Sequence, residues 1–439
     1  LYTLLIMFPV VASAQINTDR VMAIGRNALY FEDYVLSIQY FNQVINAKPY
    51  LSDPYFYRGL AKINLDDFQG AESDCSEAIE RNPFVVSAYQ VRGLARIQQN
   101  NFAGAIEDYT KALEFDPENI GVWHNMALCR IRQEDYKGAK NDLDKLIAIS
   151  PRYTKAYLMR GEVDLKQKDT LAAEKDFGKA IEIDRYDADT WASRAILRLQ
   201  QQRYKDAEAD FDHAIRLSTR NSGVYINRAL ARYHQNNLRG AMSDYDIALD
   251  IDPNNFIGHY NRGLLRAQVG DDNRAIQDFN FVIEMEPDNM MAIFNRGLLL
   301  DQTGDYKGAI KDYSTVINEY PNFLLGYQYR AQARRKIGDV KGADADEFKV
   351  LKAQLDKQNG VDPNKQTADN TENNKTRKKS DKNMNNYRKI VVADNEEGEE
   401  KYKSDYRGRV QDKNVNIVPQ PMFCLLYTSP SPRDLSTSR

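Results

Sequence analysis

Three kinds of polar side chain recur along the sequence at intervals of 34 residues. A primary amide carries a donor and an acceptor together, so it can pair with one peptide unit whatever side chain that unit bears. Arg and Asp can form charge-assisted ion pairs. These recurring polar residues are the candidates for chemistry, and the amide column consists of Asn125, Asn227, Asn261 and Asn295.

The Arg residues and the Asp residues that recur at this interval, which we call the Arg and Asp columns, admit two interpretations. A row of free guanidinium groups would bind a polyanion, whereas Arg–Asp pairs inside each repeat would be structural. Charged side chains in a packed interface need partners, and the register favours pairs: where Ile24 replaces Arg, Tyr40 replaces Asp. The fourth repeat breaks the match, with Met126 and Asp142. We therefore predict structural ion pairs within repeats, among them Arg262 with Asp278 and Arg296 with Asp312.

The same interval governs the residues that end helices. Each repeat holds two stretches with apolar residues at helical spacing and small residues at fixed places, and a residue that stops the second stretch follows. A period kept without insertions indicates one supersecondary unit stacked on the next. The residue that stops the stretch is Pro at 49, 83, 117, 151, 253, 287 and 321, while Arg185 and Thr219 hold the same register in the two remaining steps.

This pattern closely resembles the tetratricopeptide repeat (TPR) family, which has the same period and a similar pattern of aromatic, Gly, Ala and Pro residues. Ten repeats fit, and they cover residues 18–357. The resemblance implies an all-α fold, a right-handed superhelical solenoid of about ten 34-residue helix-turn-helix repeats. It also implies that the first helix of each repeat lines a concave groove.

The resemblance further implies which side chains face that groove. Several relatives carry an Asn at the position of the amide column that binds the main chain of an extended peptide. Two alternatives stay open: the Asn residues cap turns or bond neighbouring helices, and the apolar residues belong to an ordinary core. The expected peptide-binding residues are Asn125, Asn227, Asn261, Asn295, Ile257, Tyr260, Gln268, Met291, Phe294 and Gln302.

The sequence offers no pattern for catalysis or for a bound cofactor. The four His residues are scattered without metal-ligand spacing. There is no glycine-rich phosphate loop and no nucleophile elbow. The net charge of −3, from 60 Lys and Arg against 63 Asp and Glu, gives no argument for nucleic acid. We expect no enzymatic activity, no metal, no cofactor and no nucleic-acid partner.

The ends of the sequence differ in composition from the repeats. Residues 1–14 form an apolar run that ends in Ala12-Ser13-Ala14, a small-x-small pattern typical of signal peptidase sites. The run is too short to span a bilayer, begins with Leu1 and has no basic residue before it. We expect a truncated signal peptide that is cut before Gln15.

The sequence after the repeats falls into three parts. Residues 358–386 are rich in Asn, Lys, Asp and Thr, and we expect a disordered linker there. Residues 387–423, which include YRKIVVAD, regain apolar content and are expected to start an incomplete C-terminal region. Residues 424–439 resemble a translated sequencing adapter, so we expect them to be non-biological.

These expectations combine into one favoured function. We expect an exported protein of a Gram-negative bacterium, periplasmic or envelope-associated, that acts as a non-catalytic scaffold. It would bind an extended segment of a partner protein in the groove, with no membrane span in this stretch of chain. The alternatives are the sensory or regulatory arm of a longer protein with an effector domain beyond residue 423, and an architectural spacer.

Overall fold

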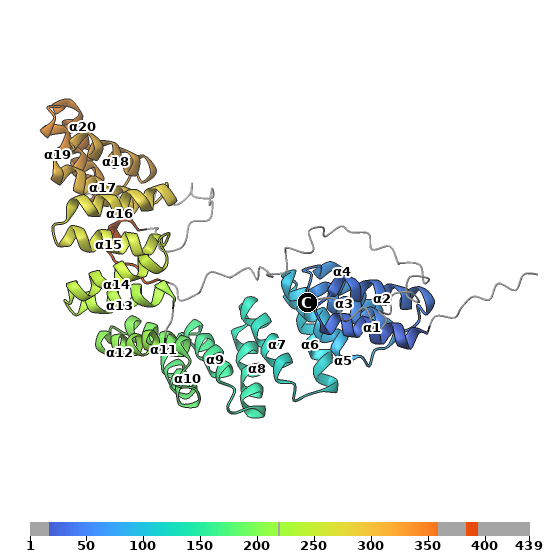
Figure 1. Ribbon diagram of the computed structural model, residues 1–439. Coiled ribbons are helices and arrows are strands. Elements are labelled where there is room, and N and C mark those ends of the chain that lie inside the picture. The colour runs from blue at the N-terminus through green and yellow to red at the C-terminus, as the bar shows by residue number, and fades with distance from the viewer. Residues whose placement is uncertain (1–16, 218–219, 359–382, 394–439) are drawn as a thin grey trace, which may run out of the picture. The chain divides into compact units, whose positions relative to one another are not determined.

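The computed structural model describes residues 17–217, 220–358 and 383–393. Over the repeats, it consists of helices packed in consecutive pairs (Figure 1). Packing divides the array into two compact units, and the boundary lies between Ile183 and Asp184. The first unit contains α1 (Thr18–Tyr30), α2 (Tyr34–Ala47), α3 (Asp53–Ile63), α4 (Phe68–Arg81), α5 (Val86–Gln98), α6 (Phe102–Phe115), α7 (Ile120–Arg132), α8 (Tyr136–Ile149), α9 (Thr154–Lys166) and α10 (Thr170–Ile183).

The second compact unit continues the same succession of pairs and ends in a short 3-10 helix. Its helices are α11 (Ala188–Gln200), α12 (Tyr204–Arg216), α13 (Ser222–His234), α14 (Leu238–Ile251), α15 (Phe256–Gln268), α16 (Asp272–Met285), α17 (Met290–Thr303), α18 (Tyr306–Glu319), α19 (Leu324–Lys336), α20 (Val340–Gln358) and η2 (Met384–Asn386). Each odd-numbered helix from α11 to α19 packs against the helix that follows it. This is the all-α solenoid of helix-turn-helix repeats that the sequence predicts.

Local sequence explains where the helices begin and end, as the ninth repeat illustrates. The Asn289 side chain caps α17 by accepting from the Ala292 N–H at 3.0 Å, which satisfies one of the free donors of the first turn. The helix then stops at Gly304, whose φ of 92° lies in the left-handed region that glycine adopts without strain. Asp305 caps the next helix through the Gly308 N–H, also at 3.0 Å.

The small residues of each first helix allow the two helices of a repeat to approach closely. A Cβ atom at Gly297 would lie 2.9 Å from the Tyr313 ring and 3.2 Å from the Asp312 side chain. Ala309, on the facing helix, is fully buried. Larger residues at these positions would push the helices apart, which accounts for the strict spacing of Gly and Ala along the sequence.

The Arg and Asp columns meet between the two helices of a repeat. Arg262 bonds Asp278 of its own repeat at 2.8 Å, and its Nη1 also reaches back to Asp246 of the preceding repeat at 2.8 Å. The Arg column therefore links neighbouring repeats as well as the two helices of one repeat. The within-repeat pairs are Arg58–Asp74, Arg92–Asp108, Arg160–Asp176, Arg194–Asp210, Arg228–Asp244, Arg262–Asp278, Arg296–Asp312 and Arg330–Asp346.

The fourth repeat, where Met126 replaces Arg, leaves its Asp short of partners. Asp142 is buried and bonds Arg130 at 2.7 Å through one carboxylate oxygen. Its other oxygen, Oδ2, has no hydrogen-bond partner among the described residues. Burial raises the pKa of Asp142 to about 7, the Arg130 charge opposes the rise, and Asp135 adds to it.

The chain beyond the repeats is described only over residues 383–393. We expected the linker to run to residue 386, but Met384–Asn386 form η2 and the Met384 side chain is buried. The packed segment therefore begins inside the predicted linker. Residues 1–14, 359–382, 394–423 and 424–439, on which the remaining predictions about the termini rest, lie outside the described residues. Within the described ranges, no helix is both long and apolar enough to cross a membrane.

Candidate functional site

Asn227, Asn261 and Asn295 occupy the same position, the sixth residue, of α13, α15 and α17. We call these three side chains the amide face. All three are buried, and a buried amide needs hydrogen-bond partners to offset its desolvation. Residues 384–393, which we call the docked segment, supply those partners and lie beside the same helices in Figure 1.

Two members of the amide face each pair with both main-chain polar groups, the N–H and the C=O, of one residue. The Asn261 Nδ2 donates to the Val391 carbonyl at 2.7 Å, while its Oδ1 accepts from the Val391 N–H at 2.9 Å. Asn227 makes the same two contacts with Ala393, both at 2.9 Å. Residues 391 and 393 are two apart, the spacing at which an extended chain presents the same side. The contacts involve main-chain atoms of the docked segment alone.

The third Asn makes a one-sided contact because the docked segment turns at this point. The Tyr387 N–H donates to the Met384 carbonyl at 3.3 Å inside the 3-10 turn, so it is not offered to the amide. The Tyr387 carbonyl accepts from Asn295 Nδ2 at 2.5 Å and from the Tyr260 hydroxyl at 2.8 Å. Asn295 Nδ2 also donates to the Met291 carbonyl of its own helix.

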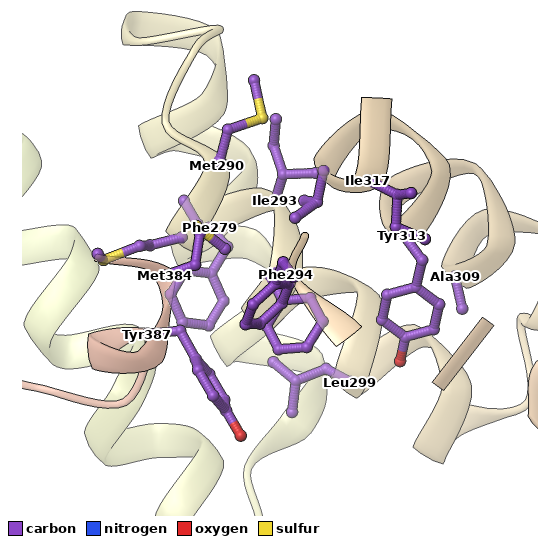
Figure 2. Packing of buried hydrophobic residues seen from close by; sticks show 14 of the residues in the cluster. Phe279, Met290, Ile293, Phe294, Leu299, Ala309, Tyr313, Ile317, Met384 and Tyr387 are labelled. Carbon is purple, nitrogen blue, oxygen red and sulfur yellow. The ribbon is translucent and has the colours of Figure 1, made fainter. Parts of the chain in front are cut away.

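An aromatic contact anchors the turn end of the docked segment. The Tyr387 ring meets Phe294 edge to face, with ring centroids 4.8 Å apart, and lies 6.5 Å from Phe323. Figure 2 shows the side chains of Met384 and Tyr387 beside Phe294. Phe294 is fully buried and also contacts Tyr313, so it belongs to the core as well as to the site. Its place in the core is therefore shown, and its role in binding a partner peptide stays a prediction.

Smaller apolar contacts hold the other end of the docked segment. Ala393 is buried in a cluster that includes Ile226 and Leu265, with Ile257 partly buried against it. Val391 packs against the cluster that contains Tyr260 and Phe294, whereas Ile390 packs against the one around Phe211 and Val224.

The docked segment meets the repeats in reverse order. Tyr387 contacts the ninth repeat, Val391 the eighth and Ala393 the seventh. The first two contacting residues are therefore four positions apart, and the last two are two positions apart.

The side chains that recognise the docked segment are uncharged. Arg388 and Lys389 are exposed, and the Arg388 guanidinium lies 5.3 Å from the Tyr387 ring centroid. Burial raises the pKa of the Tyr387 phenol, which therefore stays neutral at physiological pH. Binding here rests on neutral hydrogen bonds and apolar contact, so salt should weaken it little.

Three of the residues predicted to line the site are not brought to the docked segment. Asn125 is half-buried on α7, in the first compact unit. Gln268 is exposed and accepts from the Tyr233 hydroxyl at 2.8 Å, and Gln302 is exposed. Register alone assigns these residues to the same face as the others, but an occupant contacts only the repeats that it spans.

Sequence reasoning missed the docked segment itself. Four of its buried or half-buried side chains, Met384, Tyr387, Ile390 and Ala393, recur at intervals of three within a polar stretch, and this was the signal available. The structure groups no set of three or more His, Cys, Asp and Glu suited to a metal ion over its described residues.

Models of the tetratricopeptide repeat family match the sequence in several places. A TPR repeat model matches residues 93–129, and tetratricopeptide repeat models match residues 120–153, 154–187, 193–256 and 260–322. Together these matches cover about half of the chain. The protein belongs to the tetratricopeptide repeat family. TPR arrays in general serve as scaffolds for protein–protein interaction, stacking repeats into an extended binding surface.

The chain is also similar to solved TPR structures. A tetratricopeptide repeat protein from Parabacteroides merdae is 21% identical, with 57% of this chain and 98% of that chain covered and a TM-score of 0.45. The C-terminal part of a TPR repeat-containing protein from Cytophaga hutchinsonii is 18% identical, with 54% and 97% covered and a TM-score of 0.45. YrrB, described as a TPR protein with an unusual peptide-binding site, is 20% identical, with 42% and 95% covered and a TM-score of 0.35. No curated protein matches the chain.

Proposed function

We propose that this TPR protein is a non-catalytic scaffold that binds an extended protein segment on its amide face. The observation that carries the proposal is the pairing of Asn261 and Asn227 with the main chain of Val391 and Ala393, two bonds each. Such pairing makes no demand on the side chains of the bound segment. The amide face is thus suited to peptides as a class, and neighbouring apolar contacts select among them.

The energetics of the amide face favour a bound peptide. A neutral hydrogen bond contributes only about 0.5–1.5 kcal/mol net, whereas a buried polar group left without a partner costs about 1–3 kcal/mol. Asn227 and Asn261 are fully buried when the docked segment is present. Without a peptide they need water, and a peptide that replaces this water with matched donors and acceptors binds with little polar penalty.

We test this proposal by replacing Asn261 with Ala in the full chain and measuring amide hydrogen exchange. The Val391 N–H loses its acceptor, Asn261 Oδ1. We expect the Val391 and Ala393 amides to exchange at least about tenfold faster, since tenfold corresponds to about 1.4 kcal/mol, within the range for an unpaired buried group.

Asn125→Ala is the matched control, because Asn125 has the same register and lies on α7 in the first compact unit. It should leave exchange at residues 391 and 393 unchanged. Equal protection in Asn261→Ala and wild type would overturn the proposal. It would then favour the architectural spacer, which tolerates substitutions on this face.

We further propose that the scaffold is exported to the cell envelope of a Gram-negative bacterium. The support is the apolar run of residues 1–14 that ends in Ala12-Ser13-Ala14. Expressed behind a start codon and a basic n-region in such a bacterium, the chain is expected to accumulate in the periplasm and to begin at Gln15. N-terminal sequencing of the purified protein checks this, and an uncut N-terminus on cytoplasmic protein would contradict it.

A further inference from the structure

We propose that the docked segment is a resident ligand, which a partner protein must displace to reach the amide face. The inference rests on the proposed function. The partner chemistry that fits is an uncharged pattern in an extended protein segment: an aromatic residue, a β-branched residue four positions later, and a small residue two positions after that. An apolar residue three positions before the aromatic one completes the pattern.

The pattern follows from what each side chain of the docked segment touches. Tyr387 fills the space beside Phe294, and Met384 is buried with it, so these two positions require bulk. Val391 packs against the same cluster. Ala393 is 3% exposed beside Ile226, which is fully buried, so a larger residue there would clash.

Ile390 is half-buried against the cluster around Phe211 and Val224, but the other side chains of the docked segment leave room for variation. Those of 385, 386, 388, 389 and 392 are exposed. A partner segment is therefore free to differ at half of its positions without losing contact with the site. Since the amide contacts involve main-chain atoms alone, any other segment with the four apolar positions reproduces the full set of hydrogen bonds.

The covalent tether makes the resident ligand an effective competitor. Residues 359–382 join the docked segment to α20, so binding is intramolecular at an effective concentration on the order of millimolar. The apparent affinity of a partner equals its intrinsic affinity multiplied by the fraction of molecules whose site is empty. If the segment alone bound with a Kd of about 10 μM, the apparent affinity of a partner would fall about 100-fold.

The test measures binding of a fluorescently labelled synthetic peptide, NMNNYRKIVVA (residues 383–393), to the full chain. Tyr387→Ala removes the aromatic anchor of the resident ligand, and Val391→Pro removes the N–H that pairs with Asn261. Both variants are expected to bind the peptide at least about tenfold more tightly than wild type. Lys389→Ala is the matched control, because Lys389 is exposed, and its affinity should equal that of wild type.

Two additional measurements assign the site and the pattern. Adding Asn261→Ala to Tyr387→Ala should weaken binding of the labelled peptide at least about tenfold, since the peptide then meets an incomplete amide face. A labelled peptide with Ala in place of its Tyr should bind Tyr387→Ala at least about tenfold more weakly than the original peptide does.

The outcomes separate this inference from the proposed function. If wild type, Tyr387→Ala and Val391→Pro all bind the peptide equally, and Asn261→Ala still weakens binding, the resident ligand does not compete and the inference fails alone. If the peptide binds none of them, both proposals fail. If wild type sediments as a dimer that Tyr387→Ala converts to a monomer, the docked segment comes from a second copy, and the intramolecular assignment is wrong.

Discussion

Replacing Arg296 with Ala should lower the free energy of unfolding of the second compact unit by about 3–5 kcal/mol, the cost of leaving a buried charge without its partner. Asp312 is 3% exposed and receives bonds from Arg296 Nε at 2.8 Å and Nη2 at 2.7 Å. Several other repeats carry a second Arg one helical turn after the first, but the ninth has Leu300 at that position. The variant therefore leaves the Asp312 carboxylate uncompensated in the core.

Arg228→Ala is the matched comparison. Asp244, its partner, also bonds Arg232 at 2.9 Å, so the carboxylate keeps one cation. We expect a smaller loss of about 1–2 kcal/mol. Urea unfolding followed by circular dichroism measures both variants. Equal losses would contradict the role of the second Arg, and a loss below 1 kcal/mol in Arg296→Ala would show that the pair contributes little.

Replacing Met126 with Arg should raise stability at neutral and alkaline pH by about 1.5–3 kcal/mol, the contribution of hydrogen bonds to a charged group. The new guanidinium would reach the unpaired Oδ2 of Asp142. The pKa of Asp142 in the folded protein, about 7, should then fall. Met126 stands at the position where eight other repeats place Arg, so the geometry for the pair already exists.

The sign of the pH dependence follows from proton linkage. With its pKa raised from 3.8 to about 7, the folded protein binds more protons than the unfolded chain between these values. Stability therefore falls as pH rises through that window. Met126→Arg should flatten this fall, and so should Asp142→Asn, which cannot titrate. The urea midpoints of wild type and of both variants at pH 5 and pH 8 test this prediction. If stability falls as steeply between these pH values in the variants as in wild type, the assignment to Asp142 is wrong.

The fold could be predicted because every repeat obeys the same local rules. Pro at most steps of a 34-residue register and small residues on two helical stretches indicate where the helices start, stop and pack. The same register indicates the pairing of Arg262 with Asp278, since Arg and Asp are present together or absent together in every repeat except the fourth. These signals lie close together in the sequence, and they can be recognised because they recur in successive repeats.

The site was predictable only in part. Register puts Asn125 and Asn261 in equivalent positions, yet it cannot tell which repeats meet an occupant. The contact between Asn261 and Val391 joins residues 130 apart, and no local pattern encodes a pairing of that range. Composition placed Met384 in a polar linker, because one apolar side chain among polar ones is recognisable as buried only beside the surface that receives it.

The two kinds of contact that the docked segment makes differ in how they set the position of a bound chain along the amide face. An Asn that pairs with the main-chain N–H and C=O of one residue cannot distinguish that residue from another, so sliding the chain by two residues would re-form the bonds at Asn227 and Asn261. The contact of Tyr387 with Phe294 cannot be shifted in this way, because there is one aromatic ring and one place for it. The amide face therefore contributes affinity without fixing the register of the bound chain. A single aromatic residue determines which stretch of a partner binds there.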